Sequence, residues 1–397
     1  MRAGIACLVL AYVLSQFFRA FLAVLTPVLK SDLGATPEDL AAASGLYFLT
    51  FAALQIPVGW ALDRVGPRLT TAALFAIGGA GGALVFSFAT SPLAVKWAMA
   101  LIGVGCSPVL MASYFIFART YSPRVFGTLA GAVLGFGSLG NIASSLPMAW
   151  AVQAFGWRET LLAIAALTLL VSLAIASLVR DPERVAGPSQ GSVLDLLKMP
   201  ALWFILPMMA VNYMPAAGLR GLWIGPYYTD VFHADAAGIG RASLVMGLAM
   251  VAGNFAYGPL DRVLHTRKWL VFTGNILAIA CLFGLAAFPN TGGWRTMTLL
   301  AGVGFFGATF AMIMAHGRAF FPSHLVGRGV TLMNLFGIGL IGIAQIVTGR
   351  LHAALTPDPM IVNSAPPATP YVALFLFFGV ALLIGTLIYA FSEDRTD

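Results

Sequence analysis

Charged side chains are scarce in this chain of 397 residues. Only 9% of the residues are Asp, Glu, Lys or Arg, 59% are hydrophobic, and the mean hydropathy is +0.90. Soluble domains carry about 25% charged residues, and a chain of this length could not cover a water-facing surface with so few. The composition excludes a large soluble protein and indicates an all-α, polytopic membrane protein.

Cysteine is also rare. The three residues, Cys7, Cys106 and Cys281, each fall inside an apolar run. Their number and spacing predict neither a disulfide framework nor a metal site, and we interpret them as small packing residues. No pairing of a nucleophile with a base emerges either. We therefore expect no enzymatic activity, no catalytic residue, no metal and no cofactor.

Acidic residues are missing from the interior of the apolar runs. All 15 lie in loops or near the ends of runs, and the five histidines lie near such ends or beside an inner loop. A proton symporter usually needs a buried carboxylate or histidine in the membrane. We therefore expect an anion exchanger, a uniporter, or a carrier that moves a proton on the substrate itself.

Long apolar runs are what the chain has in abundance. Twelve are long enough to cross a bilayer core of about 30 Å, and only helices suit runs of this length with Gly and Pro inside. The first run is too long for a signal peptide and carries Arg19 in its interior. The predicted spans are 4–29, 40–62, 70–89, 94–118, 126–153, 159–179, 201–228, 238–260, 269–289, 295–316, 329–353 and 369–391.

Basic residues are distributed unevenly between the loops. With the N-terminus inside, 14 of the 22 lie on the inner side and six on the outer side or at outer span ends. Loops rich in Lys and Arg stay in the cytoplasm. We therefore expect both termini to be cytoplasmic in a cell (inner) membrane, and the net charge of +7 needs no nucleic acid to explain it.

The chain repeats itself at about half its length. Asp63-Arg64 returns as Asp261-Arg262 after 198 residues, and Gly103 returns as Gly302 after 199. Duplicated membrane units are the usual build of a transporter, with the substrate held where the halves meet. A polar central segment divides the copies. We predict a six-helix bundle over 1–180, a cytoplasmic loop over 181–198 and a second six-helix bundle over 199–397, related by a pseudo-two-fold axis.

A charged motif follows the second span. The run from Gly59 to Arg68, GWALDRVGPR, resembles the G-x-x-x-D-R-x-G-x-R signature of the major facilitator superfamily, and the run from Tyr257 to Arg262 is a degraded second copy. In that family this loop latches the cytoplasmic ends of the two halves. The resemblance covers the whole chain and implies twelve helices in two bundles with alternating access. It assigns the latch to Gly59, Asp63, Arg64, Arg68, Asp261 and Arg262.

The motif also has a physical interpretation. Gly59 would let a neighbouring helix approach closely, and Asp63 would suit a helix N-terminus, where the helix dipole favours a carboxylate. The alternative is a charged turn that is merely solvated.

Two arginines lie inside apolar runs: Arg19 near the middle of the first, and Arg220 in the outer half of the seventh, 201 residues later. A charge at mid-membrane costs at least about 2.5–3.5 kcal/mol, so such a residue indicates function. In the family fold these two helices line the central cavity, where a guanidinium pair would suit a carboxylate or phosphate. The alternative is that each arginine binds backbone carbonyls or snorkels to an interface.

Polar and aromatic residues share the faces of these arginines. Tyr12, Gln16 and Arg19 follow helical spacing on one face. Any single Asn or Tyr serves an interhelical hydrogen bond as readily as a ligand contact. The predicted substrate-binding set is Arg19, Arg220, Gln16, Tyr12, Tyr114, Asn141, Tyr213, Trp223, Tyr227, Asn254, Asn334 and Gln345.

A finer resemblance concerns the substrate. Phe18-Arg19 followed by Asp32-Leu33-Gly34 is similar to the first helix of the anion/cation symporter group, whose arginine here binds organic anions. The arginine pair also resembles that of the organophosphate:phosphate antiporters. Cys106 stands where many of these carriers have a glutamate, which argues against proton coupling there.

We therefore predict a monomeric secondary transporter of a small organic anion in the lipid bilayer. The alternatives are an efflux carrier of amphipathic or drug-like compounds and a non-transporting membrane sensor or assembly factor.

Overall fold

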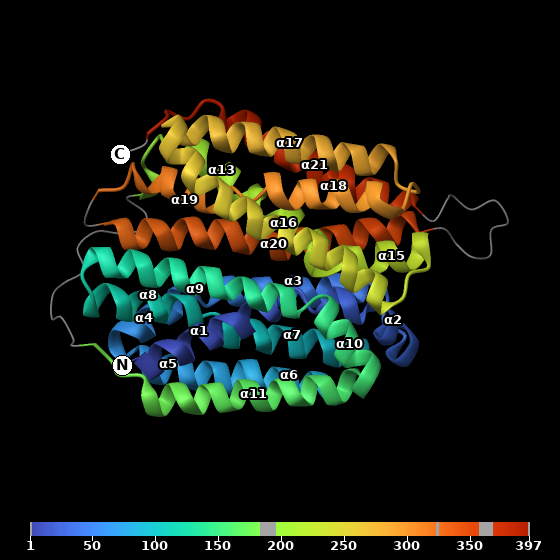
Figure 1. Ribbon diagram of the computed structural model, residues 1–397, viewed down its shortest axis with the longest axis horizontal. Helices are drawn as coiled ribbons and strands as arrows, with labels where there is room; N and C mark the ends of the chain where they lie inside the picture. The colour runs from blue at the N-terminus through green and yellow to red at the C-terminus, as the bar shows by residue number, and fades with distance from the viewer. Residues whose placement is uncertain (1, 183–195, 323–324, 357–367, 396–397) are drawn as a thin grey trace. The chain divides into compact units, whose positions relative to one another are not determined.

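The computed structural model describes residues 2–182, 196–322, 325–356 and 368–395, and these residues form helices and connecting turns with no strand. They divide into two compact units, Met1–Pro188 and Ser189–Asp397, coloured blue to green and yellow-green to red in Figure 1. Most of the predicted central loop, 181–198, lies outside the described residues. Each unit is considered by itself below.

The N-terminal unit contains six predicted spans, several of them made of two or more helices. Three of these spans are bent pairs, with angles of 52°, 41° and 44° at their breaks. The helices in chain order are α1 (Arg2–Phe17), α2 (Leu22–Leu33), α3 (Pro37–Ala53), α4 (Gln55–Arg64), α5 (Pro67–Leu74), the π-helix η1 (Phe75–Ala80), α6 (Gly81–Ser87), α7 (Pro92–Cys106), α8 (Val109–Thr120), α9 (Pro123–Ala143), α10 (Leu146–Phe155) and α11 (Trp157–Leu178).

Prolines account for two of the three bends. Pro57 and Pro147 lie four residues after the last residue of α3 and of α9, and a proline ring clashes with the carbonyl four residues before it. The break between α1 and α2, residues 18–21, has no such proline, since the next one is Pro27 inside α2. Its backbone tightens instead, because the N–H groups of residues 19 and 20 bond three residues back.

The C-terminal unit holds the other six spans. They are α13 (Leu202–Asn212) with α14 (Met214–Gly218), the π-helix η2 (Leu219–Trp223) and α15 (Ile224–Phe232); α16 (Ala236–Leu264); α17 (Arg267–Ala287); α18 (Gly293–Phe306) with α19 (Phe310–Arg318); α20 (Val326–Leu355); and α21 (Thr369–Tyr389). Within the described residues, nine helical segments of the chain are long and apolar enough to cross a membrane, or twelve when each bent pair is one span. The all-α prediction with twelve spans is confirmed.

The glycines that make equivalent close contacts in the two units are not the pair that the sequence repeat aligns. On α7, a Cβ at Gly103 would lie 2.3 Å from the Tyr47 carbonyl oxygen of α3; on α18, a Cβ at Gly304 would lie 2.8 Å from the Met246 carbonyl oxygen of α16. The packing therefore matches Gly103 with Gly304, not with Gly302 as the sequence offset suggested. That offset of 201 is also the one between Arg19 and Arg220.

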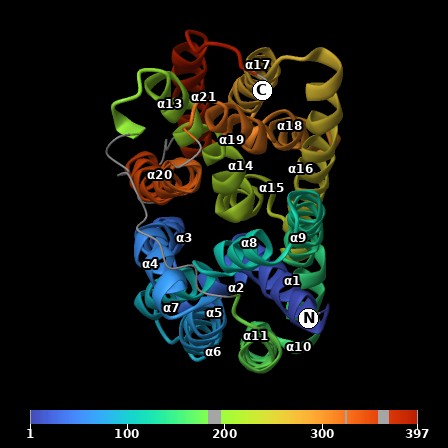
Figure 2. The same ribbon diagram turned by 90° about the vertical axis from the view of Figure 1, so that its left-hand side faces the viewer.

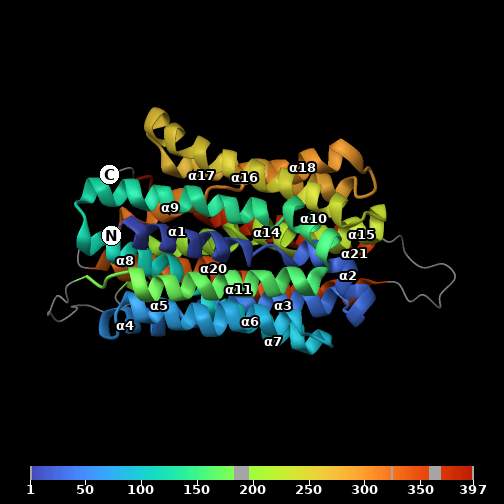
Figure 3. The same ribbon diagram turned by 60° about the horizontal axis from the view of Figure 1, so that its bottom comes forward.

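Each unit packs its first span against several neighbours. In the N-terminal unit α1 runs beside α9 and α11 (Figure 3). In the C-terminal unit α13, which begins the first span, packs against α20 and α21 (Figure 2). The intramembrane arginines are thus set inside helical bundles and are not on isolated helices.

Candidate functional site

Arg19 lies in the break between α1 and α2. Its side chain is half-buried, and its guanidinium carbon lies 4.9 Å from the ring centre of Phe51 on α3. A guanidinium over an aromatic face is held by the ring quadrupole. The break therefore places a cation within the apolar depth of the first span and keeps it against an aromatic wall.

The predicted face of α1 is assembled as expected. The Gln16 amide donates to the Tyr12 hydroxyl at 2.6 Å, and the Tyr12 hydroxyl lies close to that of Tyr114 on α8. Gly137 on α9 leaves room for this group, since a Cβ there would lie 2.4 Å from the Tyr12 ring. Asn141 is half-buried one turn further along α9. The structure thus groups five predicted residues, Arg19 included, around α1.

Three residues next to Arg19 escaped the sequence prediction. Ser15, Tyr47 and Cys106 are at most 1% exposed. The Tyr47 hydroxyl lies beside the Arg19 guanidinium and the Cys106 thiol, and the thiol lies beside the Ser15 hydroxyl. The spacing of Ser15, one turn before Arg19, was a usable signal. Cys106 carried a different signal, because it stands where many organic-anion carriers have a glutamate, and Tyr47, which comes from another span, carried none.

Arg220 occupies η2 and is only 4% exposed. The Tyr213 hydroxyl is its electrostatic neighbour, as the shared face predicted. Its side chain lies against Gly247 of α16, where an added Cβ would meet Nη1 at 3.3 Å. Arg220 is therefore packed within its own unit more tightly than Arg19.

The other predicted residues of the C-terminal unit have varied surroundings. Trp223 donates through its indole N–H to Gln345 and Thr348 of α20, both at 3.0 Å. Tyr227 donates to the carbonyl of Pro289, and its ring packs on Tyr371. The Trp223 bonds join η2 to α20, and the Tyr227 bond reaches the turn after α17. Two more predicted residues differ in exposure, Asn254 being exposed on α16 and Asn334 half-buried on α20.

A polar triad closes the helix breaks of the C-terminal unit. The Asn212 amide at the end of α13 donates to Asn275 at 2.9 Å and to Thr309 at 2.8 Å, and the Asn275 amide donates to Thr309 at 2.9 Å. Thr309 lies in the break between α18 and α19. Buried amides and hydroxyls that satisfy each other stabilise such breaks away from water.

The expectation that the spans hold no buried histidine is wrong. His316 is fully buried and bonds to Tyr389 at 2.6 Å and to the Glu393 carbonyl at 2.8 Å. His352 is 4% exposed and stacks on Trp223 at 5.2 Å. Proximity to a span end in the sequence did not expose these rings, because helices from the same unit cover them.

The interpretation of the motif over residues 59–68 also needs correction. Asp63 lies in the last turn of α4 and not at a helix N-terminus, and it pairs with Arg119 at 3.3 Å. The N-terminus of α5 is held by Asp181, which accepts from the Arg68 backbone N–H at 2.8 Å. Gly59 makes no close helix approach, since an added Cβ would only reach Met111 at 3.9 Å.

The corresponding charges of the C-terminal unit are arranged similarly. Asp261 pairs with Arg267 at 3.3 Å. Asp394 holds the N-terminus of α17, accepting from the backbone N–H groups of Arg267 at 3.2 Å and Lys268 at 3.0 Å. In both units an acid from beyond the last helix thus caps the third span. Arg64 and Arg262, predicted latch residues, lie in the last turns of α4 and α16.

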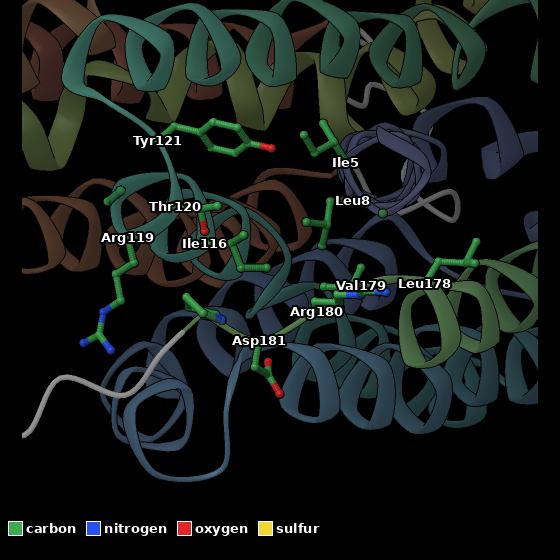
Figure 4. Close-up of a pocket in the computed structure, with 13 residues that line it drawn as sticks. Ile5, Leu8, Ile116, Arg119, Thr120, Tyr121, Leu178, Val179, Arg180 and Asp181 are labelled. Carbon is green, nitrogen blue, oxygen red and sulfur yellow. The ribbon is translucent and has the colours of Figure 1, made fainter. Parts of the chain in front are cut away.

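A cavity of about 660 Å³ opens in the N-terminal unit between the start of α1 and the ends of α8 and α11, away from Arg19. Figure 4 shows Tyr121 and Ile5 facing each other across it, while Arg119 and Asp181 point away. Arg119 is paired with Asp63 and Asp181 caps α5, and most of the other residues that line the cavity are apolar. This cavity lacks the converging polar groups of a site for a small anion.

Residues 8–346 match the family model of the Major Facilitator Superfamily. The chain belongs to this superfamily. It is a multi-pass membrane transporter and not an enzyme.

Two known bacterial proteins resemble the chain. It is 26% identical to the probable sulfoacetate transporter SauU of Cupriavidus necator over 69% of this chain and 66% of that protein, just under two thirds of its length. It is 23% identical to the probable L-galactonate transporter of Escherichia coli over 85% of this chain and 80% of that protein.

A solved structure supports the fold. The bacterial homolog of the human lysosomal transporter Spinster, in an inward-facing and unoccupied conformation, matches with a TM-score of 0.79 and 16% identity, covering 98% of this chain and 96% of that one. At this identity the likeness concerns the superfamily fold alone.

Proposed function

We propose that this superfamily member moves a small organic anion by alternating access, with Arg19 binding the anionic group and Arg220 assisting. The observation that carries the proposal is the position of Arg19, a half-buried guanidinium in a helix break that no proline explains. Broken helices at mid-membrane are where transporters of several folds bind their substrates. Basic residues are in excess in the loops of the predicted inner side. This excess supports a protein of the inner membrane with both termini in the cytoplasm.

The similarity to known carriers points in the same direction. The substrates named for the two relatives, sulfoacetate and L-galactonate, are both carboxylates. A guanidinium binds a carboxylate through two parallel hydrogen bonds. The resemblance therefore favours a carboxylate-bearing solute as cargo.

The Tyr12–Gln16 pair is suited to the neutral part of the substrate. Gln16 donates its amide to Tyr12, and among the described residues its buried Oε1 atom has no hydrogen-bond partner. A buried acceptor without a partner costs free energy until a donor arrives. A hydroxyl group next to the substrate carboxylate would be such a donor, one helical turn from Arg19.

The efflux alternative requires a counter-charge inside the membrane. A cationic compound would need a buried acid. Among the described residues, Asp32, Asp39 and Asp63 are bound at span ends to Trp157, Lys96 and Arg119, and the half-buried Asp230 at the end of α15 accepts from Tyr371. We keep the prediction that no protein carboxylate inside the membrane carries a proton during transport. The buried rings of His316 and His352 are the groups to mutate if transport proves to depend on a protein proton.

The test is binding and counterflow with purified protein. Carboxylates, sulfonates and phosphates are titrated onto the protein in detergent, and the best ligand is then exchanged across proteoliposomes loaded with it. The matched control for Arg19→Ala is Arg295→Ala, which removes a guanidinium lying 5.8 Å from the Trp294 ring at the start of α18. Binding of organic anions that Arg19→Ala abolishes and Arg295→Ala keeps is the expected result. Absence of anion binding by the folded wild-type protein would refute the proposal.

A further inference from the structure

A buried histidine binds the residues that follow the last helix of the C-terminal unit. His316 lies near the end of α19 and is 0% exposed. Its Nδ1 lies 2.6 Å from the Tyr389 hydroxyl at the end of α21, and its Nε2 lies 2.8 Å from the Glu393 carbonyl oxygen. Residues 390–395, which follow α21, are called the C-terminal segment below. The proposed anion site uses none of these groups.

The C-terminal segment makes further contacts with the same unit. Asp394 accepts from the two backbone N–H groups that begin α17. The ring centres of Phe391 and of Phe204 on α13 lie 6.5 Å apart, and the Arg395 guanidinium lies 4.7 Å from the ring centre of Phe320 after α19. One short segment thus connects the ends of α13, α17, α19 and α21.

The two bonds of His316 determine where its proton lies. A carbonyl oxygen can only accept, so Nε2 must carry a hydrogen and donate it to Glu393. The other nitrogen of a neutral imidazole is an acceptor, so Nδ1 accepts from the Tyr389 hydroxyl. Both contacts are therefore satisfied by one form of the ring, the neutral Nε2–H tautomer.

A second proton on the ring would disturb this arrangement. It would turn Nδ1 into a donor directed at the Tyr389 hydroxyl, which donates to Nδ1 in the neutral form. It would also place a positive charge on a side chain with no exposed surface, and burying a charge away from water is costly. This cost falls when the C-terminal segment leaves and the His316 ring reaches water.

The basic groups around His316 add to the cost of a second proton. Arg267 donates to the carbonyl of Ala315, the residue before the histidine, at 3.4 Å, and it also pairs with Asp261. Lys268 follows Arg267 and is a further electrostatic neighbour of the ring. Both cations repel a proton on the imidazole.

The acids near His316 do not balance these cations. Asp394 favours a proton on the ring, but its carboxylate already accepts three hydrogen bonds, two of them from the start of α17 and one from the Thr266 hydroxyl. The side chain of Glu393 is 68% exposed and lies 3.6 Å from Arg395. The closed arrangement therefore favours the neutral histidine.

The repeat in the chain supplies an internal comparison. The offset of 199 residues places Phe117 opposite His316 and Tyr121 opposite Phe320. In each unit the two rings meet edge to face, with centres 6.4 Å apart for Phe117 and Tyr121 and 5.5 Å apart for His316 and Phe320. The C-terminal unit thus has a ring that can take up a proton where the N-terminal unit has one that cannot.

We propose that His316 is a pH-dependent switch. The neutral ring holds residues 390–395 against the ends of α17, α19 and α21, and protonation releases them and speeds the conformational cycle of the transporter. Imidazole is the side chain that ordinarily changes charge between about pH 5 and 8. The closed state is therefore favoured at high pH and is lost as the pH falls.

The first test measures the mobility of the C-terminal segment. A nitroxide label is attached to Glu393→Cys in full-length protein whose three native cysteines are replaced by alanine. This position is suitable because the Glu393 side chain is largely exposed and its backbone carbonyl makes the bond to His316. The spin-label spectrum should be immobilised at pH 8, and a mobile component should become the major one by pH 5. Identical spectra at both pH values overturn the proposal.

The matched control carries the label in the N-terminal unit. Arg180→Cys places it in the segment that follows α11, next to Asp181, which caps α5. Its spectrum should be the same at pH 8 and pH 5, because Phe117 cannot take up a proton. An equal gain of mobility at both labelled positions would indicate general loosening of the protein and would overturn the proposal.

A substitution of the histidine assigns the effect to one group. His316→Gln keeps a donor for the Glu393 carbonyl and has no proton to gain between pH 8 and pH 5, so the label at residue 393 should stay immobilised. A mobile component that still appears at low pH in this variant means that another group titrates, and the switch is then wrong. If His316→Gln does not fold, the comparison of the two label positions decides.

The last test measures transport. Release removes a common restraint on three spans, and conformational steps often limit the turnover of such proteins. The exchange rate at saturating substrate, with the best anion from the binding screen, should therefore rise from pH 7.5 to pH 5.5 in the wild type and not in His316→Gln. The same pH dependence in both proteins overturns the effect on the cycle. The label tests need no substrate, so they remain decisive even if the proposed anion transport is refuted.

Discussion

The two units treat the polar groups at their helix breaks differently. In the C-terminal unit, the amides of Asn212 and Asn275 bond to each other and to Thr309 across three spans. In the N-terminal unit, the Tyr47 hydroxyl beside the break has the Arg19 guanidinium and the Cys106 thiol as neighbours, and the thiol has the Ser15 hydroxyl. Amides that bond to each other stabilise a break, whereas a guanidinium can only donate and is suited to an anionic ligand. We therefore propose that the N-terminal unit supplies the main anion contact.

The two arginines show the same contrast. Arg19 is half-buried in a span bent by 52°. Arg220 is 4% exposed in a π-helical segment, beside Tyr213 and Gly247. Although they lie 201 residues apart in a duplicated chain, their surroundings are unequal, so we expect unequal contributions to substrate binding.

Substitution of the two arginines should have the largest effect on substrate affinity. Arg19→Ala should weaken binding of the anionic substrate by about 2–5 kcal/mol, as for the loss of one partner from a buried charge pair, and Arg220→Ala by less. Arg19→Lys should rescue poorly, because an ammonium lacks the bidentate fork. Calorimetry on purified variants, with folding checked by circular dichroism, measures this. Near wild-type affinity in folded Arg19→Ala would end the organic-anion proposal and favour efflux of neutral or amphipathic compounds.

Replacing one packed glycine in each unit by alanine should have the next largest effect, and a different one in each unit. Gly103→Ala forces a Cβ against the Tyr47 carbonyl and should lower the free energy of unfolding by about 1–3 kcal/mol. Gly247→Ala meets only the flexible end of Arg220 at 3.3 Å, so it should leave stability nearly unchanged and alter substrate affinity slightly. Thermal unfolding in detergent and ligand titration separate the two. Similar destabilisation by both variants would contradict this account.

Replacing Asp63, the acid of the motif over residues 59–68, by a neutral residue should change the rate of substrate exchange. Asp63 pairs with Arg119, but its side chain is 62% exposed, so Asp63→Asn should change stability by no more than about 1 kcal/mol. If the motif is a latch, counterflow should slow while substrate affinity stays. Asp261→Asn, whose pair with Arg267 is more buried, is the companion variant. Loss of affinity with preserved exchange rates would make the latch interpretation wrong.

The smallest expected effect is a pH dependence at the cap of α17. Burial pushes the pKa of Asp394 upward, but hydrogen bonds from the Thr266 hydroxyl and from the backbone N–H groups of Lys268 and Arg267 outweigh it and hold that pKa below 3.8. The charged cap therefore stabilises the protein above pH 3.8, and this stabilisation is lost as the pH falls through the lowered pKa. Unfolding temperatures between pH 6 and pH 3 should fall more for the wild type than for Asp394→Asn; parallel curves would contradict it.

The sequence was sufficient for the spans and for the arginines, because both depend on local composition. A run of about 20 apolar residues can only be a membrane helix, and a guanidinium inside it stands out without any partner. The face of Tyr12, Gln16 and Arg19 was equally accessible, since helical spacing alone places them together.

What only the tertiary structure decided was which residues meet across helices. Tyr47 and Cys106 reach Arg19 from α3 and α7, Gly103 matches Gly304 in packing, and His352 is buried although it lies near a span end. Hydropathy and periodicity describe one helix at a time. The contacts of the site depend on how neighbouring helices bend, rotate and approach, which no single stretch of sequence records.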